Sequence, residues 1–201
     1  MLVRVLNLDS AQDRMELVKA EMDKMGFEFE RFAALDPYPN SGPWIGSSYS
    51  HTEMLRGVDG LLLACEDDVI FEEGALEIFN KAFAQLPEDW DMFYLGGNVK
   101  LPATRYSENL FSITGGVHCT HAILYSENAR NYVLDNFNTL NTGDIDITHY
   151  DHWLYCHGQA ALKCFMCYPV IAYQRPNYSG PRGGFMDYRS EMEENEKKHL
   201  I

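Results

Sequence analysis

Hydrophobic and polar positions along the chain follow the two periods of regular secondary structure. Residues 3–8 form a mostly apolar stretch in which Val recurs, which predicts a buried first strand. Apolar residues then recur at spacings of three and four from Met15 to Met25, which predicts a helix with Ser10 as its N-cap and Gly26 at its end. Apolar and charged residues alternate over 27–32, which predicts a second strand.

The rest of the chain alternates predicted strands and helices. Residues 36–49 hold three prolines and two glycines, which predicts a loop. Ser50–Glu53 has the spacing of a capping box, which predicts a short helix from Ser50 to about Gly57. Further strands are predicted at 60–65, 91–95, 111–114, 122–125 and 162–173, and further helices over 74–85 and after Ser126. This alternation predicts an α/β fold with a mainly parallel central sheet.

Length and composition set the expected domain organisation. The chain has 201 residues, of which 46% are hydrophobic, enough for one domain with its own core. After Pro176 the sequence is rich in Gly, Pro and charged residues, which predicts a loop and a frayed tail. We therefore expect one domain over residues 1–176 and a C-terminal loop and charged tail over 177–201.

The charge balance limits the classes of partner. With 30 acidic and 16 basic residues the formal net charge is −14, which argues against binding to nucleic acid or to an anionic membrane. A phosphate-bearing ligand stays compatible with this charge where a divalent cation bridges it. No apolar run approaches the ~20 residues of a transmembrane segment, and five cysteines are an odd, sparse set typical of reduced thiols. These features predict a cytoplasmic protein.

The strongest chemical signal is the acidic triplet Glu66-Asp67-Asp68, directly after a predicted buried strand. Side chains alternate along an extended chain, so Glu66 and Asp68 are expected on one side, roughly 6.5 Å apart, with Asp67 facing away. Crowded carboxylates repel one another and are relieved by a cation, and oxygen ligands favour Mg²⁺ or Mn²⁺. The alternative is a turn and helix N-terminus, where acids interact favourably with the helix dipole.

Eight short motifs in a fixed order place this triplet in a wider pattern. They are Val5–Asp9 with Asp13-Arg14, Phe29–Asp36, Gly46–His51, Ala64–Val69, Trp90–Gly96, Thr120–Ser126, Tyr150–Leu154 and Pro169–Gln174. In this order they resemble the motifs of the family 25 glycosyltransferases, the group that includes lipopolysaccharide galactosyltransferases and collagen galactosyltransferase domains. Each motif alone is weakly specific, whereas the eight in order are spread from Val5 to Gln174, which is most of the length of the chain.

The resemblance implies a single GT-A-type nucleotide-sugar-binding domain and a metal-dependent, inverting transfer reaction. A hexose, galactose or glucose, would pass from a UDP-sugar to a hydroxyl of a glycan or glycosylated surface molecule, as in lipopolysaccharide biosynthesis. The implied cofactor is Mn²⁺ (or Mg²⁺), with Asp68 as the direct metal ligand and Glu66 acting as a ligand through water or contacting the ribose. The metal acts as a Lewis acid on the departing diphosphate.

The same resemblance and the places of the motifs indicate the substrate-binding residues. They are Asn7, Asp9, Arg14, His51, Glu66, Asp67, Thr120, His121 and Gln174. The first three lie where the first strand meets its helix, a suitable place to hold a nucleotide. His51 follows the predicted cap, where a side chain can donate to a phosphate at a helix N-terminus; the alternative is a surface histidine.

Inversion requires a general base for the proton of the acceptor hydroxyl. The late aspartate of the family falls on Asp151, which is the expected catalytic residue. An ordinary Asp has a pKa of about 3.9, so burial or neighbouring acids would have to raise it. Asp146 and His149 are the alternatives for this role.

Three other interpretations stay open from the sequence. One is a zinc site built from His118, Cys119 and His121 together with His149, Asp151 and His152, although structural zinc sites have tighter ligand spacing. A second is a catalytically inactive protein that binds a nucleotide or a glycan on the same fold. A third is a metal-dependent phosphoesterase that uses the acidic triplet, for which the sequence offers no second metal cluster.

Overall fold

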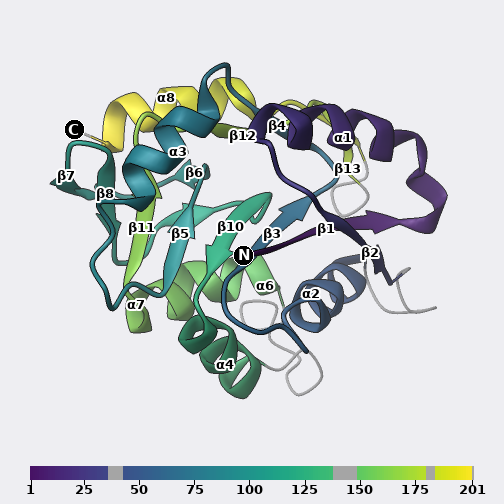
Figure 1. Ribbon diagram of the computed structural model, residues 1–201, viewed down its shortest axis with the longest axis horizontal. Helices are drawn as coiled ribbons and strands as arrows, with labels where there is room; N and C mark the ends of the chain where they lie inside the picture. Colours follow the sequence, from purple (N-terminus) through teal and green to yellow (C-terminus); the bar gives the residue numbers. More distant parts are fainter. Residues whose placement is uncertain (36–42, 138–148, 180–183, 201) are drawn as a thin grey trace.

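An eight-stranded sheet lies between two layers of helices in the computed structural model, which describes residues 1–35, 43–137, 149–179 and 184–200 (Figure 1). The strand order is β2-β1-β3-β10-β5-β11-β8-β7. Six of these strands share one direction, and β10 and β8 run against them. The predicted α/β class with a mainly parallel sheet is confirmed. The strands are β1 (Leu2–Leu8), β2 (Glu30–Ala34), β3 (Leu62–Glu66), β5 (Met92–Tyr94), β7 (Thr104–Ser107), β8 (Leu110–Ile113), β10 (Ala122–Tyr125) and β11 (Cys164–Cys167).

Three small antiparallel ladders accompany the large sheet. They join β4 (Val69–Phe71) to β12 (Ala172–Gln174), β6 (Asn98–Val99) to β9 (Val117–His118), and β13 (Asn177–Ser179) to β14 (Gly184–Met186). In the first ladder Val69 lies opposite Gln174. Because β4 begins directly after the acidic triplet, this register brings residues 172–174 beside the triplet.

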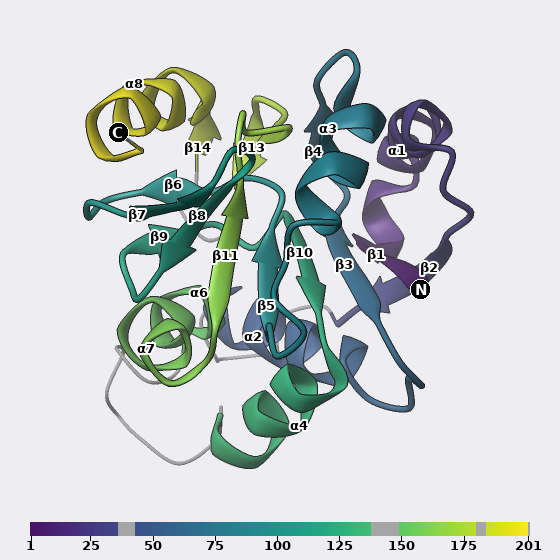
Figure 2. The same ribbon diagram turned by 60° about the vertical axis from the view of Figure 1, so that its left-hand side comes forward.

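The helices cover the two faces of the sheet (Figure 1). One face carries α1 (Asp13–Met25) and α3 (Ala75–Phe83). The other face carries α2 (Pro43–Met54), α4 (Glu127–Asn136) and α6 (Tyr150–Trp153). The last of these continues through a π-helical turn, Leu154–Gly158, into α7 (Gln159–Ala161). Each layer buries apolar side chains against the sheet, Met22 and Phe79 on the first face and Met54 and Trp153 on the second. In Figure 2 the central strands β11, β5, β10 and β3 lie side by side between these layers.

The predicted helix start at Ser50 is wrong, because α2 already begins at Pro43. Proline is common in the first helical turn, since its ring presets φ and the missing N–H would have no partner there. Ser50 lies inside the helix, where its hydroxyl donates to the carbonyl of Gly46 (2.6 Å) and accepts from the backbone N–H of Leu35 (2.9 Å). The rest of the predicted loop, 36–42, lies outside the described residues.

Two other boundaries differ from the sequence prediction. Ser10 does not cap α1, because a short 3₁₀ turn, Asp9–Ala11, precedes that helix. The single strand predicted at 162–173 is divided into β11 and β12. Pro169 lies between them, and a residue without an N–H cannot continue the hydrogen-bonded ladder.

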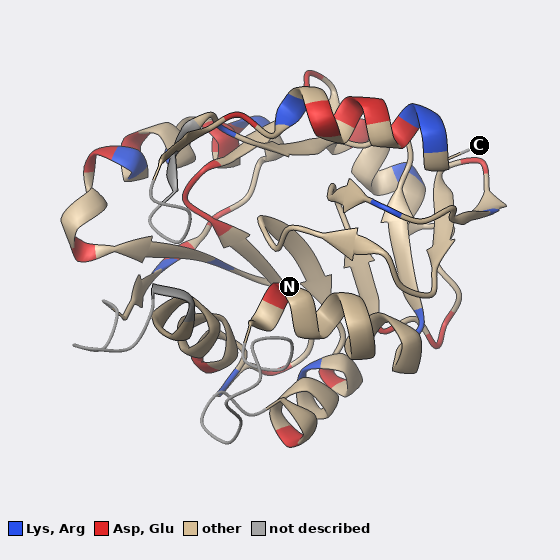
Figure 3. Ribbon diagram, turned by 180° about the vertical axis from the view of Figure 1, so that it is seen from behind, with Lys and Arg blue, Asp and Glu red and all other residues tan. Residues whose placement is uncertain are grey.

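The segment after residue 176 contains a short antiparallel ladder and a helix. Beyond the β13–β14 ladder, α8 (Arg189–His199) packs against β6 and β12 and buries Met192 completely. Charged residues of both signs follow one another along α8 (Figure 3). Within the described residues no helix has the length and apolar character that a membrane span requires.

One partly buried acid of α8 makes the stability of the fold depend on pH. Burial, together with the charge of Glu193, raises the pKa of Glu196 from 4.5 to about 7, although the Tyr173 hydroxyl lies 3.3 Å from its carboxylate. The folded state therefore binds more protons than the unfolded state between these values, and stability falls as the pH rises through this window.

We expect Glu196→Gln, which is neutral at every pH, to raise the melting temperature at pH 8 by roughly 2–4 °C and to change it little at pH 4.5. Thermal melts at the two pH values measure the difference. Glu194→Gln, at an exposed position on the same helix, is the control. An equal gain in both variants, or no gain at pH 8, would contradict the assignment.

Candidate functional site

The acidic triplet lies at the carboxyl end of β3, between β1 and β10 in the sheet. Glu66 is the last residue of β3, lies opposite Leu6 of β1, and donates its backbone N–H to the carbonyl of His121 (3.0 Å). Open α/β sheets place their ligands at the carboxyl ends of strands. The triplet therefore occupies the edge of the sheet where a ligand site is expected.

Asp67 faces away from the other two acids, toward the start of the chain. Its carboxylate accepts from Asn7 Nδ2 (2.7 Å) and from the guanidinium of Arg14 (2.9 Å). Burial raises the pKa of Asp67 in spite of these two partners. The alternation predicted from the sequence therefore agrees with the contacts of the triplet.

Asn7 connects the residues around Asp67 rather than facing solvent. It is 1% exposed, and it also donates to the carbonyl of Ala11 (2.9 Å) and accepts from Arg31 Nε (2.8 Å). In this structure Asn7 contacts other side chains of the site and exposes almost no surface, and its predicted contact with a nucleotide stays a prediction. Asp9 is exposed and pairs with Arg31, whereas the Arg14 side chain is 30% exposed beside Asp67.

Arg31 is a site residue that the sequence prediction missed. It bonds both to Asn7 and to Asp9, although it lies on the neighbouring strand. The only signal for it is its place in the motif Phe29–Asp36, because pairing across strands leaves no local pattern.

We expect Asn7→Ala to destabilise the fold by about 2 kcal/mol or more, roughly 4–8 °C in melting temperature. The change removes a donor from the partly buried Asp67 carboxylate and an acceptor from Arg31. Thermal unfolding measures the loss. Asp9→Ala, at an exposed end of the same hydrogen-bonded group, should cost no more than about 0.5 kcal/mol, and equal losses would contradict this view of Asn7.

Glu66 is held from the opposite side by Thr120 and His51. The Thr120 hydroxyl donates to Glu66 Oε1 (2.5 Å), and His51 Nε2 lies 3.2 Å from the same oxygen. Burial acts to raise the pKa of Glu66, but the hydrogen bonds from His51 and Thr120 and the charge of His51 outweigh it and lower that pKa well below its ordinary value. Glu66 is therefore a carboxylate at neutral pH.

His51 reaches Glu66 from a different position than predicted. It lies in the last turn of α2, not at a helix N-terminus, because the helix begins at Pro43. Its ring is buried and stacks on that of Tyr150, with ring centroids 5.2 Å apart. The predicted phosphate contact at a helix N-terminus is wrong, and His51 instead contacts the acidic triplet.

His121 lies beneath the site without exposed surface. Burial lowers the pKa of its imidazole, and the neutral ring donates from Nε2 to the carbonyl of Ala172 (3.1 Å). Gly96 makes this contact possible, because a Cβ there would lie 1.8 Å from the Ala172 oxygen and 3.1 Å from His121 Nε2. In this structure His121 contacts the protein itself through Ala172, and the substrate contact expected from the sequence stays a prediction.

Gln174 contacts the third acid of the triplet. Its side-chain amide lies 3.4 Å from Asp68 Oδ2, and the backbone N–H of Arg175 donates to the Asp68 carbonyl (2.6 Å). The Arg175 guanidinium is paired with the buried Glu21 (3.2 Å). The structure therefore brings Gln174 next to Asp68. Both residues are predicted from the sequence to belong to the same site. Residues 180–183 lie outside the described residues.

Asp151 lies on α6 next to the backbone of the β9–β10 connection. Its Oδ1 accepts from the N–H of Cys119 (2.9 Å), and its Oδ2 lies 3.4 Å from His118 Nδ1. Cys119 has a φ of 78°, in the left-handed region that costs a non-glycine residue strain. The bond from Asp151 helps to hold this turn. His149 precedes α6 as its N-cap residue, and Asp146 lies outside the described residues.

The thiol of Cys119 belongs to a segment that contacts both α6 and the acidic triplet, because the Cys119 N–H donates to Asp151 and the Thr120 hydroxyl donates to Glu66. Burial raises the pKa of this thiol most, and the nearby negative charges raise it further: those of Asp151, Glu66 and Asp68. Asp151 and Glu66 also act on His121. The segment 119–121 is therefore the meeting point of the acidic triplet and α6.

The donor set at this point fits a divalent cation that is shared with a substrate. Within the described residues no group of three or more His, Cys, Asp or Glu is arranged to hold a metal ion by itself. Mg²⁺ and Mn²⁺ typically take one or two protein carboxylates and complete their shell with water and substrate phosphates. Asp68 and the ionised Glu66 supply such a pair of oxygen ligands.

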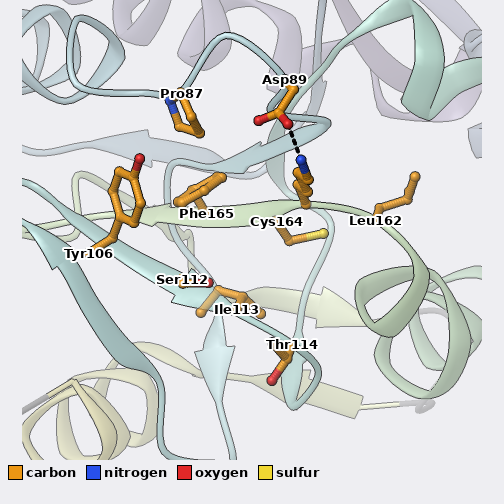
Figure 4. A pocket seen from close by; sticks show the side chains of 10 residues that line it. Pro87, Asp89, Tyr106, Ser112, Ile113, Thr114, Leu162, Cys164 and Phe165 are labelled. Atoms are coloured by element: carbon orange, nitrogen blue, oxygen red, sulfur yellow. Dashed lines mark hydrogen bonds and ion pairs between the residues drawn. The ribbon is translucent and has the colours of Figure 1, made fainter.

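A cavity of about 360 Å³ lies away from the triplet and is lined by Leu162–Phe165, at the start of β11, among other residues (Figure 4). It lies at the amino end of β11, whereas the triplet follows the carboxyl end of the parallel-running β3. Its charged pair, Asp89 and Lys163, is joined by a salt bridge, and most of its other lining side chains are apolar, Tyr106 and Phe165 among them. We place the candidate site at the triplet because three acids follow one another there at the carboxyl end of a strand, where open α/β sheets bind their ligands.

No protein-family model matches the sequence, and no curated protein matches it. Among solved structures, the chain is similar to A197 from STIV, with a TM-score of 0.52 and 12% identity over 92% of this chain and 93% of that one. Likeness at this identity shows the fold alone.

Two further matches have lower TM-scores. A glycosyltransferase involved in the glycosylation of the major capsid of PBCV-1 has a TM-score of 0.47 and 9% identity over 98% of this chain and 100% of that one. The catalytic domain of Drosophila beta1,4galactosyltransferase 7, in complex with xylobiose, has a TM-score of 0.49 and 8% identity over 94% of this chain and 73% of that one.

Proposed function

We propose that the protein is a metal-dependent, inverting glycosyltransferase related to family 25. It would move a hexose, galactose or glucose, from a UDP-sugar to a hydroxyl of a glycan or glycosylated surface molecule. One observation carries the proposal: Glu66 and Asp151 accept hydrogen bonds from the neighbouring residues Thr120 and Cys119, so a carboxylate of the triplet and one of α6 meet at the carboxyl edge of β3. The eight motifs that resemble family 25 support it, because four of them, those that hold Asn7, His51, Glu66 and Asp151, meet at this edge.

The donor would be held by the triplet and its partners. A chain with a net charge of −14 repels a nucleoside diphosphate unless a cation bridges the two. Asp68 and Glu66 would hold Mn²⁺ or Mg²⁺, which supplies Lewis acidity to the leaving diphosphate. Arg14, fixed by Asp67 and partly exposed, would add a positive group on the nucleotide side.

The acceptor would enter near α6. In an inverting reaction the acceptor oxygen attacks the anomeric carbon from the face opposite the diphosphate, and a base on the protein removes the hydroxyl proton. Among the described residues, Asp151 is a carboxylate outside the triplet that contacts the same turn, so we assign it a part in this proton transfer, either as the base or as the residue that orients the base.

Donor turnover tests the proposal. The protein is incubated with UDP-galactose or UDP-glucose, Mn²⁺ and free sugars, and the released UDP is quantified beside an EDTA control. We expect Mn²⁺-dependent release of UDP and, from an α-linked donor, a product of β configuration by NMR. Binding of UDP without release would favour an inactive binding protein, and release of inorganic phosphate would favour a phosphoesterase; either result contradicts the proposal.

A further inference from the structure

Both oxygens of Asp151 are directed at groups of the protein itself. Oδ1 accepts the N–H of the strained Cys119, and Oδ2 faces His118 Nδ1 at 3.4 Å. An aspartate in this setting suits the orientation of a neighbouring group better than direct proton removal. Asp is moreover a weak base near neutral pH, with an ordinary pKa of about 3.9 against about 6.5 for His.

His118 is held in one orientation. It belongs to β9, where its backbone pairs with Asn98 of β6, and its ring stacks on that of Tyr155, with centroids 4.2 Å apart and planes 11° from parallel. Its side chain is 27% exposed, so an acceptor can reach the ring. The titratable groups that face it are Asp151 and His152 from α6 and Tyr155 from the π-helical turn.

The pairing with Asp151 also fixes which ring nitrogen can accept a proton. A carboxylate beside Nδ1 favours the neutral tautomer with its proton on Nδ1, which leaves a lone pair on Nε2. No described residue forms a hydrogen bond or ion pair with His118 Nε2. This is the arrangement of an oriented histidine base.

We propose that His118 is the general base of the transfer reaction and that Asp151 is its positioning residue. This assignment rests on the proposed glycosyltransferase function. The acceptor O–H proton passes to His118 Nε2, and the acceptor oxygen forms a bond to the anomeric carbon. The bond from that carbon to the diphosphate oxygen breaks, and its electron pair leaves with UDP. The imidazolium, stabilised by the Asp151 carboxylate, later returns its proton to water.

Hydrolysis of the donor, with water as the acceptor, tests this role without knowledge of the natural acceptor. UDP release from UDP-galactose and UDP-glucose with Mn²⁺ is measured from pH 5 to 8.5 for the wild type and for His118→Gln, Asp151→Asn and His152→Gln. His152→Gln is the control. Like His118, His152 stacks on Tyr155, but the Asp151 carboxylate faces His118. Thermal melts and UDP affinity with Mn²⁺ show whether each variant keeps its fold and its donor site.

We expect kcat of the wild type to fall as the pH is lowered, because a general base that already carries a proton cannot accept another one. His118→Gln should lower kcat about 100-fold or more and remove this pH dependence, while the Kd for UDP stays within about twofold. Asp151→Asn should lower kcat less and shift the profile to lower pH, because the charge that stabilises the imidazolium is lost.

Two results would overturn the assignment, and they are distinguishable. If the wild type releases UDP and His118→Gln keeps its rate and its pH profile, or if Asp151→Asn costs more than His118→Gln, His118 is not the base, while the transferase function stands. If the wild type releases no UDP from either donor, the proposed function fails and the assignment fails with it.

Discussion

Asp68→Asn is expected to raise the Kd for UDP in the presence of Mn²⁺ about 100-fold or more, which corresponds to about 2.7 kcal/mol or more. The substitution keeps the shape of the side chain and removes the charge that the proposed metal site needs. Because the same cation would stabilise the leaving diphosphate, we expect donor turnover to fall about 1,000-fold or more. Isothermal titration calorimetry with and without Mn²⁺ measures the binding, and UDP release measures the turnover.

Asp59→Asn is the matched control for this change. Asp59 is exposed and lies just before β3, at the end of the strand opposite the triplet, so its charge is remote from the proposed donor site. We expect wild-type affinity and turnover from this variant. Retained Mn²⁺-dependent binding of UDP in Asp68→Asn, at wild-type affinity, would remove Asp68 from the metal site.

Gly96→Ala is expected to destabilise the fold by about 3 kcal/mol or more, roughly 6–12 °C in melting temperature. The added Cβ would lie 1.8 Å from the carbonyl oxygen of Ala172, a backbone atom that cannot rotate away. Relief of this clash requires β12 to move. Two residues of the site would move with it: Ala172, which accepts the hydrogen bond from His121, and Gln174, at the end of the strand. Thermal unfolding measures the loss of stability, and the UDP affinity of any folded fraction measures the effect on the site.

Gly184→Ala is the control for the glycine substitution. A Cβ at Gly184 would meet no atom within 4 Å, and the residue does not have a left-handed φ. We expect a change within about 0.5 kcal/mol. A melting temperature of Gly96→Ala close to that of the wild type would show that the contact between β5 and β12 is looser than the distances indicate.

Local periodicity accounts for the features that could be predicted from the sequence. The apolar run before Glu66 predicts β3, and the period of two along an extended chain predicts that Asp67 faces away from its neighbours. The contacts of Asp67 with Asn7 and Arg14 follow that pattern. Ser126 likewise caps α4 as predicted, with its hydroxyl accepting from the N–H of Ala129 (3.1 Å).

Features that depend on distant partners were not predictable in this way. Ser50 and Glu53 have the spacing of a capping box, yet α2 starts at Pro43, about two turns earlier, so His51 meets Glu66 from the end of the helix. The sequence indicates His118 only as a ligand of a candidate zinc site, and its pairing with Asp151 leaves no local signal because Asp151 lies 33 positions further along the chain. Burial is not predictable in this way either, as for Asn7, whose place in a motif says nothing about its exposure.

A thermal-shift titration of UDP with and without Mn²⁺ tests the central claim most directly, because it requires neither an acceptor nor turnover. A ligand at 100 times its Kd adds about 2.7 kcal/mol, roughly 5–10 °C for a domain of this size. We predict a shift of this size that needs UDP and Mn²⁺ together and is absent from Asp68→Asn. The absence of a shift with UDP in the presence of Mn²⁺ or Mg²⁺ would contradict the account, and the acidic triplet would then be only a turn after a buried strand.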